Sequence, residues 1–147
     1  MTGSIEAAED VTQECFLVLV RGTAFDSQRA ALGTYLFGVA RNLVFRRLRV
    51  STRETEGLSE TPDPTETLDA ILALERSELV QRAIATLPPL QREAIILFEY
   101  EELPLENIAT VTGAQVGAIK ARLQRARDSL RKQLAPVLAP KPERTCL

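Results

Sequence analysis

The sequence predicts an all-α fold in which two small helical domains are joined by a flexible acidic linker. Apolar residues recur at the three- and four-residue spacing of helices in several segments, and Gly and Pro are scarce inside them. A polar, acidic stretch that carries Pro62 and Pro64 lacks this periodicity and divides the segments into two groups. We therefore expect a shortened helical domain at 1–50, the linker at 51–69, a four-helix unit with a helix-turn-helix at 70–135, and a tail at 136–147.

The composition is that of an ordinary soluble protein and argues against several functions. The chain is 45% apolar and 26% charged, and it contains no His, the commonest general base and metal ligand. Cys15 and Cys146 lie near opposite ends and form no metal-binding pair; Cys15 is expected to be a buried thiol. We expect no enzyme, no cofactor, no metal and no small-molecule substrate, because neither a nucleophile–base pair nor a ligand cluster is visible.

No apolar run is long enough to cross a membrane, since CFLVLV at residues 15–20 is the longest dense one. The first ten residues lack the basic start and apolar core of an export signal. We expect no direct membrane insertion and a cytoplasmic location. The net charge of −2 is unusual for a protein that holds DNA unaided, but the charge is unevenly spread.

The first helix is expected from Asp10 to Val20, after an acidic lead-in that favours a helix start through the backbone dipole. Gln13 and Glu14 lie outside its apolar stripe, where they would meet a partner or water. The inward face is expected to comprise Val11, Cys15, Phe16 and Leu19.

The second helix is expected from Leu32 to Arg49, with an apolar face and a basic C-terminal half. Cations at a helix C-terminus are favourable with the dipole, which is one explanation of the arginines. The other is a nucleic-acid surface, because aromatic side chains stack on exposed bases while guanidinium groups hold phosphates. The expected inward residues are Leu32, Leu36, Val39, Leu43 and Leu48, and the arginines are interleaved with Tyr35, Asn42 and Phe45.

In the C-terminal unit, prolines mark the helix boundaries. A third helix from Leu68 to Leu87 ends at Pro88, and Pro89 suits the first turn of a fourth helix at 90–101. Pro104 starts the helix-turn-helix. The ordered chain is expected to end at the prolines Pro136, Pro140 and Pro142.

The helix-turn-helix is predicted at residues 105–131. Ala109 is small enough for close helix approach, Gly113 supplies the turn, and Ile119 would anchor the second helix in the core. The second helix is strongly basic, with Asp128 the only acid between Val116 and Lys132. This pattern favours insertion into the DNA major groove. The alternative is a surface helix with a solvated basic face.

These stretches resemble a known family. One long stretch resembles region four of the bacterial sigma factors: TLPPLQREAIILFEYEELPLENIATVTGAQVGAIKARLQRARDSLRKQL. Two shorter segments resemble region two of the same family: DVTQECFLVL and LGTYLFGVARNLVFRRLR. Within that family the chain is most similar to the small extracytoplasmic-function group. The resemblance implies a dissociable subunit that binds core RNA polymerase and promoter DNA, with an anti-sigma factor as a further partner.

The resemblance also implies roles for individual residues. Region two is implied to contact polymerase through Asp10, Gln13, Glu14 and Phe16. It is implied to bind and open the downstream element through Tyr35, Arg41, Asn42, Arg46 and Arg49. Region four is implied to contact the upstream element through Lys120, Ala121, Arg122, Gln124 and Arg125.

The sequence departs from the family pattern at three places. The family has a further helical stretch of region two before the DVTQE segment, so either a packing helix is missing or the natural start lies upstream of Met1. The family usually has Trp where Tyr35 stands and commonly Asp where Arg46 stands. Two other functions remain open: a free-standing helix-turn-helix regulator that binds an operator directly, and a degenerate sigma-like protein that binds only protein partners.

Overall fold

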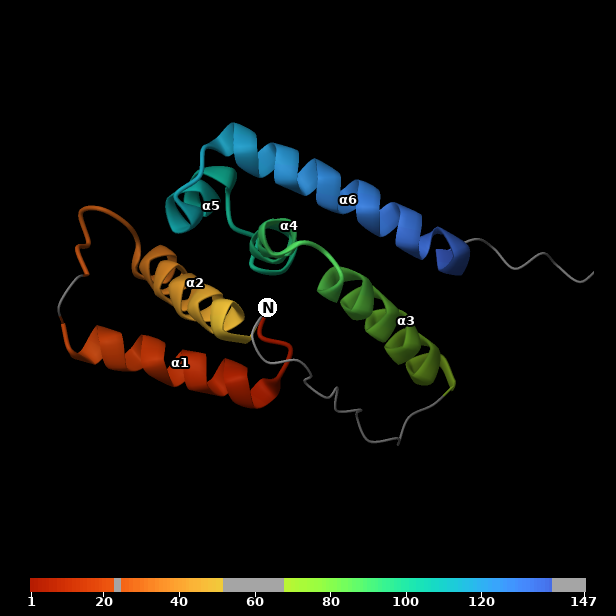
Figure 1. Cartoon of the computed structure of the whole chain (residues 1–147), viewed down its shortest axis with the longest axis horizontal. Coiled ribbons are helices and arrows are strands. Elements are labelled where there is room, and N and C mark those ends of the chain that lie inside the picture. Colours follow the sequence, from red (N-terminus) through yellow and green to blue (C-terminus); the bar gives the residue numbers. More distant parts are fainter. Residues whose placement is uncertain (23–24, 52–67, 139–147) are drawn as a thin grey trace, which may run out of the picture.

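The computed structural model describes residues 1–22, 25–51 and 68–138, and every regular element in these ranges is helical. The elements are α1 (Ile5–Val20), α2 (Leu32–Ser51), α3 (Leu68–Ala85), α4 (Pro89–Ile95), the π-helical turn η1 (Ile96–Tyr100), α5 (Leu105–Thr112) and α6 (Val116–Leu138). The predicted all-α fold is therefore confirmed (Figure 1). The predictions for the linker prolines, for Pro140 and Pro142, and for Cys146 fall outside the described residues.

The helices α1 and α2 lie side by side and share a small core (Figure 1). Its buried residues are Val11 and Cys15 from α1 and Leu43 and Val44 from α2. Cys15 is a buried free thiol, as predicted, and burial raises its pKa, which keeps it protonated.

Two residues predicted to face inward do not. Phe16 is 57% exposed and Leu32 is 43% exposed. The stripe that α2 covers on α1 runs through Val11 and Cys15, four residues apart, and Phe16 lies about 100° further around the helix. Helical spacing alone does not decide which arc of α1 is buried. The prediction that Phe16 faces inward was wrong, because α2 packs on the arc through Val11 and Cys15.

The second core joins α3, α4, η1, α5 and α6, and its largest fully buried side chains are Leu87, Ile108 and Ile119. Pro89 occupies the first turn of α4, as the sequence predicted. Arg92 joins α4 to the preceding helix: its Nη2 donates to the carbonyl oxygens of Ala85 and, at 3.0 Å, of Leu87. These bonds satisfy carbonyl groups at the end of α3 that no helical N–H can reach.

Several helix boundaries differ from expectation. The first helix begins at Ile5 rather than at Asp10, because the Ser4 hydroxyl caps it by accepting from the Ala7 N–H. The fourth helix changes from α to π geometry at Ile96, which inserts a wider turn before the loop at residues 101–104. The last helix passes through Pro136 and ends at Leu138. Proline lacks the N–H and its ring crowds the carbonyl four residues earlier, and α6 ends two residues after Pro136.

Glu102 in the loop after η1 has φ +51°, and no other non-Gly residue among those described has a positive φ. A non-Gly residue in this left-handed region costs roughly 1–2 kcal/mol of stability. Replacing it by Gly removes that cost, but the greater conformational freedom of Gly in the unfolded chain cancels part of the gain. We expect Glu102→Gly to raise the free energy of unfolding by about 1 kcal/mol, measured by denaturant unfolding. The control is Glu101→Gly, at a right-handed position with φ −94°, which should lower it. Equal effects of the two changes would contradict the prediction.

Candidate nucleic-acid interface

The turn between α5 and α6 has the geometry that the sequence predicted. Gly113 adopts the left-handed conformation with φ 68° and ψ 17°, which ends α5. The Thr112 hydroxyl donates to the Ile108 carbonyl at 2.8 Å and accepts from the Ala114 N–H at 3.3 Å. Ile119 is completely buried, so the first turns of α6 are anchored against α5. The turn and the anchor of the helix-turn-helix are therefore confirmed.

The side of α6 opposite its buried stripe presents donors and small residues. Lys120, Ala121, Gln124 and Arg125 are exposed, and Arg122 is half-buried. Within the described part of the chain, Lys120 and Arg125 form no ion pair. Four of the five predicted upstream-element residues therefore lie together on the open face.

The arginines of α6 beyond this group are held by acids. The Arg127 Nη2 lies 2.7 Å from Glu99 Oε1, and its guanidinium covers the Phe98 ring at 5.3 Å. Asp128 accepts from the Gln124 amide and from Arg131, each at 3.2 Å. Lys120 and Arg125, which form no ion pair with another described residue, thus lie in the N-terminal half of α6.

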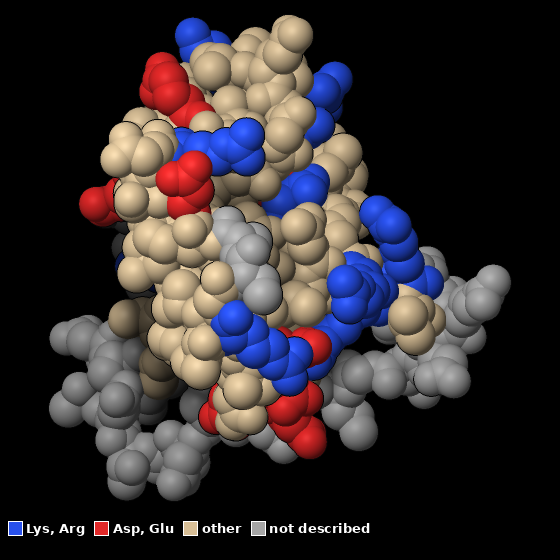
Figure 2. Space-filling view, turned by 90° about the vertical axis from the view of Figure 1, so that its left-hand side faces the viewer, with Lys and Arg blue, Asp and Glu red and all other residues tan. Residues whose placement is uncertain are grey.

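The predicted downstream-element residues lie on α2 in three different environments. Asn42, Arg46 and Arg49 are exposed. Tyr35 is half-buried and packs its ring against Phe25, with centroids 5.4 Å apart at 57°. Figure 2 shows the end of the molecule that bears α5 and the start of α2: Lys and Arg side chains predominate on one side, and acids lie mainly along the other side and the lower edge, with some cations among them.

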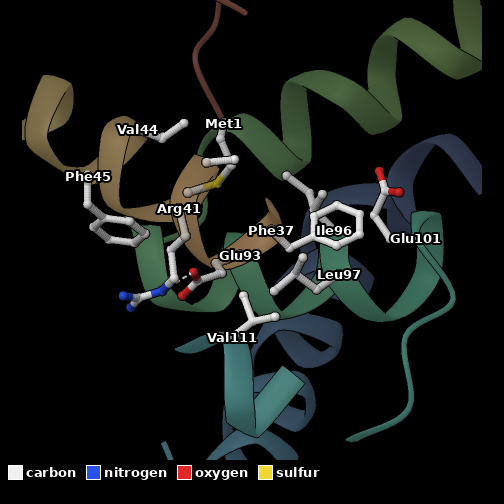
Figure 3. Close-up of a pocket in the computed structure, with 11 residues that line it drawn as sticks. Met1, Phe37, Arg41, Val44, Phe45, Glu93, Ile96, Leu97, Glu101 and Val111 are labelled. Atoms are coloured by element: carbon white, nitrogen blue, oxygen red, sulfur yellow. Dashed lines mark hydrogen bonds and ion pairs between the residues drawn. The ribbon is translucent and has the colours of Figure 1, made fainter. Parts of the chain in front are cut away.

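Arg41 is engaged inside the protein, across the boundary between the two groups of helices. Its Nε lies 2.5 Å from Oε1 of Glu93, a residue of α4 whose side chain is only 5% exposed. Its guanidinium also covers the Phe45 ring at 4.7 Å. In Figure 3 the pair sits beside a hollow of about 130 Å³ between α2 and η1, lined by Phe37, Leu97 and other apolar side chains. Arg41 is therefore held at its Nε by Glu93, and its side chain is 21% exposed.

Glu93 is the site residue that sequence reasoning missed. Burial raises its pKa, although the hydrogen bond and charge of Arg41 and the charge of Arg122 act in the opposite direction. Its second oxygen, Oε2, has no hydrogen-bond partner among the described residues. The available signal was its position four residues before Leu97, on the face of the fourth helix that had to be buried.

The four predicted polymerase-contact residues are all exposed on α1. The carboxylates of Asp10 and Glu14 lie 3.7 Å and 3.5 Å from Arg47 of α2, in exposed ion pairs. Arg47 also donates to the Ala7 carbonyl at 3.1 Å. The exposed ring of Phe16 lies on this same helix.

The described residues contain no cluster of three or more His, Cys, Asp or Glu side chains placed to hold a metal ion. None of the helices in these ranges has the length and hydropathy of a membrane span.

Comparisons with known proteins agree with the geometry. The family Sigma-70 region 2 matches residues 1–54, and the family Sigma-70, region 4 matches residues 77–130. The ECF RNA polymerase sigma factor SigW of Bacillus subtilis is 34% identical over 148 residues, covering 91% of this chain and 79% of that protein. SigC of Mycobacterium tuberculosis is 33% identical over 138 residues, covering 90% and 72%.

A solved structure shows the same arrangement. The sigma factor RpoE, crystallised with the anti-sigma factor NepR from Bartonella quintana, superposes with a TM-score of 0.71 at 26% identity. The match covers 91% of this chain and 84% of RpoE. The region 2 match precedes the region 4 match along the chain. The chain covers 79% of SigW and 72% of SigC, each more than 30% identical to it. The chain therefore belongs to the extracytoplasmic-function (ECF) group of bacterial RNA polymerase sigma factors.

Proposed function

We propose that this sigma factor binds core RNA polymerase through α1 and reads promoter DNA through α6 and α2, acting in the cytoplasm. The observation that carries the proposal is the open face of α6, where exposed Lys120, Gln124 and Arg125 follow a confirmed helix-turn-helix turn. The alternative of a free-standing regulator is not favoured, because it leaves the region-two match at residues 1–54 without a role.

Region four has the parts that major-groove binding requires. The N-terminal residues of a recognition helix contact base edges, and on α6 these positions carry long donors. Ala121 lies between them and is small enough for the helix to approach the bases closely. Because arginine makes its best base contact with guanine O6 and N7, Arg125 is the residue we assign to a base edge.

Region two has the parts that binding to an opened strand requires. The exposed amide of Asn42 and the exposed Arg46 and Arg49 supply polar and phosphate contacts along one side of α2. Tyr35 is the aromatic candidate for stacking, once it exchanges its contact with Phe25 for a base. Arg41 borders this surface while Glu93 holds its Nε.

The α1 surface suits a protein partner rather than DNA. Its acids would repel phosphates, whereas a basic partner protein would attract them. An exposed aromatic ring such as that of Phe16 is a typical anchor of protein interfaces. An anti-sigma factor is a further partner, since the relative RpoE forms a complex with one.

We expect Phe16→Ala to weaken binding to core RNA polymerase by at least about fivefold, because interface anchors contribute more than roughly 1 kcal/mol. The measurement is competition with a labelled sigma factor for core polymerase. Phe16 is exposed in the free protein, so the change should leave its stability nearly unaltered. The control is Glu75→Ala, an exposed acid of α3 and not of α1. Unchanged affinity of the Phe16 variant would remove α1 from the polymerase interface.

The proposal as a whole is tested by reconstitution with core RNA polymerase, scoring co-elution and initiation at a candidate promoter. Binding with initiation is the expected result. Binding without initiation would support a degenerate sigma-like protein. Specific operator binding by the chain alone, without polymerase affinity, would support the free-standing regulator.

A further inference from the structure

Asp128 places a negative charge on the face of α6 that is proposed to bind DNA, which is itself negatively charged. At about 100° per residue, its side chain projects between those of Gln124 and Arg125, one turn further along and on the same side as Ala121. It is the only acid from Val116 to Lys132, and a carboxylate there repels phosphates. Its contacts give it a different role.

The Asp128 carboxylate holds the Gln124 side chain in one orientation. The Gln124 Nε2 donates to both Oδ1 and Oδ2, at 3.2 Å each. An ionised carboxylate only accepts hydrogen bonds, so it attracts the amide nitrogen and repels the amide oxygen. The amide is therefore kept from turning over. Because the two oxygens lie close together and equally far from the nitrogen, one N–H is shared between them and the second N–H points away.

The rest of the amide remains available for a base. The oxygen of Gln124 and its second N–H form an acceptor–donor edge, and Gln124 is exposed. In the major groove, adenine offers the matching pair, the N6 amino group and the N7 acceptor, whereas guanine offers two acceptors. An amide held in a single orientation presents this edge in a fixed order along the helix. An amide free to turn over presents it in both orders.

Asp128 also restrains a positive charge. The Arg131 Nη1 lies 3.2 Å from its Oδ1 in an exposed ion pair, which draws the guanidinium toward the protein. Phosphate contacts by arginine strengthen binding to every sequence alike. Asp128 therefore lowers non-specific attraction to DNA while it orders the side chain that distinguishes bases.

We propose that Asp128 is a positioning residue for promoter recognition: it orients the Gln124 amide toward an adenine in the upstream element and withholds Arg131 from the phosphates. This inference rests on the proposed function of α6 as the recognition helix. It assigns selectivity at one base pair to a residue that itself touches no DNA.

The test uses the full chain assembled with core RNA polymerase and a set of promoters carrying each of the four base pairs at each upstream-element position. The variants are Asp128→Ala, Gln124→Ala and the double variant. The matched control is Glu99→Ala, which also removes one exposed acid and also releases an arginine of α6, Arg127, from an ion pair. Relative binding of the promoter set is measured, together with affinity for a duplex without a promoter at several salt concentrations.

Asp128→Ala is expected to reduce the preference for adenine at one position roughly fivefold, the lower end of what a bidentate base contact contributes. It should also tighten non-specific binding and steepen its salt dependence by about one charge. Gln124→Ala should lose the same preference, and adding Asp128→Ala to it should cause no further loss. Glu99→Ala should tighten non-specific binding without changing any base preference.

Two outcomes would overturn the inference. One is a base preference that Asp128→Ala leaves unchanged. The other is a further loss of base preference when Asp128→Ala is added to Gln124→Ala. Failure of the proposed function is distinguishable from both, because the unmodified holoenzyme would then select no promoter sequence at all.

Discussion

Replacing Arg41 by Met is expected to lower the free energy of unfolding by about 3 kcal/mol, because removing one partner of a buried ion pair strands the other charge. Met preserves most of the aliphatic packing of the arginine stem, so the loss reports the charge. Glu93 is the stranded partner, with a side chain only 5% exposed and Oε2 without a hydrogen-bond partner among the described residues. The measurement is denaturant unfolding at neutral pH.

The loss should depend on pH in a defined direction. Burial raises the pKa of Glu93 above its ordinary value, so the contribution of this carboxyl to stability is greatest when it is protonated. That contribution is fully present below the ordinary glutamate pKa and declines as pH rises through the raised value. The difference in free energy of unfolding between the parent chain and the Arg41 variant should therefore be largest near neutrality. It should shrink in acid, where Glu93 is protonated in both chains.

Two controls separate this pair from a general effect of losing an arginine. Arg47→Met breaks exposed ion pairs from the same helix and should cost less than about 1 kcal/mol. Adding Glu93→Gln to Arg41→Met should recover part of the stability, because the stranded group is then neutral. If Arg41→Met lowered the free energy of unfolding no more than Arg47→Met, the Arg41–Glu93 contact between α2 and α4 would contribute no more to stability than an exposed ion pair. The double variant should still open promoters poorly, since it lacks the proposed DNA contact.

Arg125→Ala is expected to weaken use of the preferred promoter by about 1–3 kcal/mol, the magnitude for a bidentate contact to guanine. Arg125 is exposed on α6 and forms no ion pair with another described residue, so its removal leaves no buried charge and no cavity. Stability should be nearly unchanged. The measurement is initiation by the reconstituted holoenzyme on promoters that vary at one upstream position at a time.

The matched control for Arg125 is Lys132→Ala, which removes one exposed cation nearer the end of the same helix. Its loss should be small and equal on all sequences, as for a phosphate contact. A uniform loss in the Arg125 variant as well would reassign that residue to the DNA backbone. Relaxed selectivity at a single base pair would support the assigned contact.

Local features of this protein were predictable because each depends on residues that are close in sequence. Gly113 ends α5, since a left-handed position follows directly from helix termination. Pro89 starts α4, since its missing N–H costs nothing in a first turn. Ile119 is buried because it continues the apolar stripe of α6. The family resemblance rests on such local stretches, and the comparisons confirmed it.

What the sequence determined by itself is the set of helices, their turns and the basic character of α6. What only the tertiary structure decided is which arc of each helix is covered and which distant charges meet. Phe16 faces solvent because α2 packs on the arc through Val11 and Cys15. Arg41 meets Glu93 across 52 positions of sequence, a pairing that no local pattern encodes. Periodicity specifies angles around one helix axis, whereas burial and ion pairing depend on where a second helix lies.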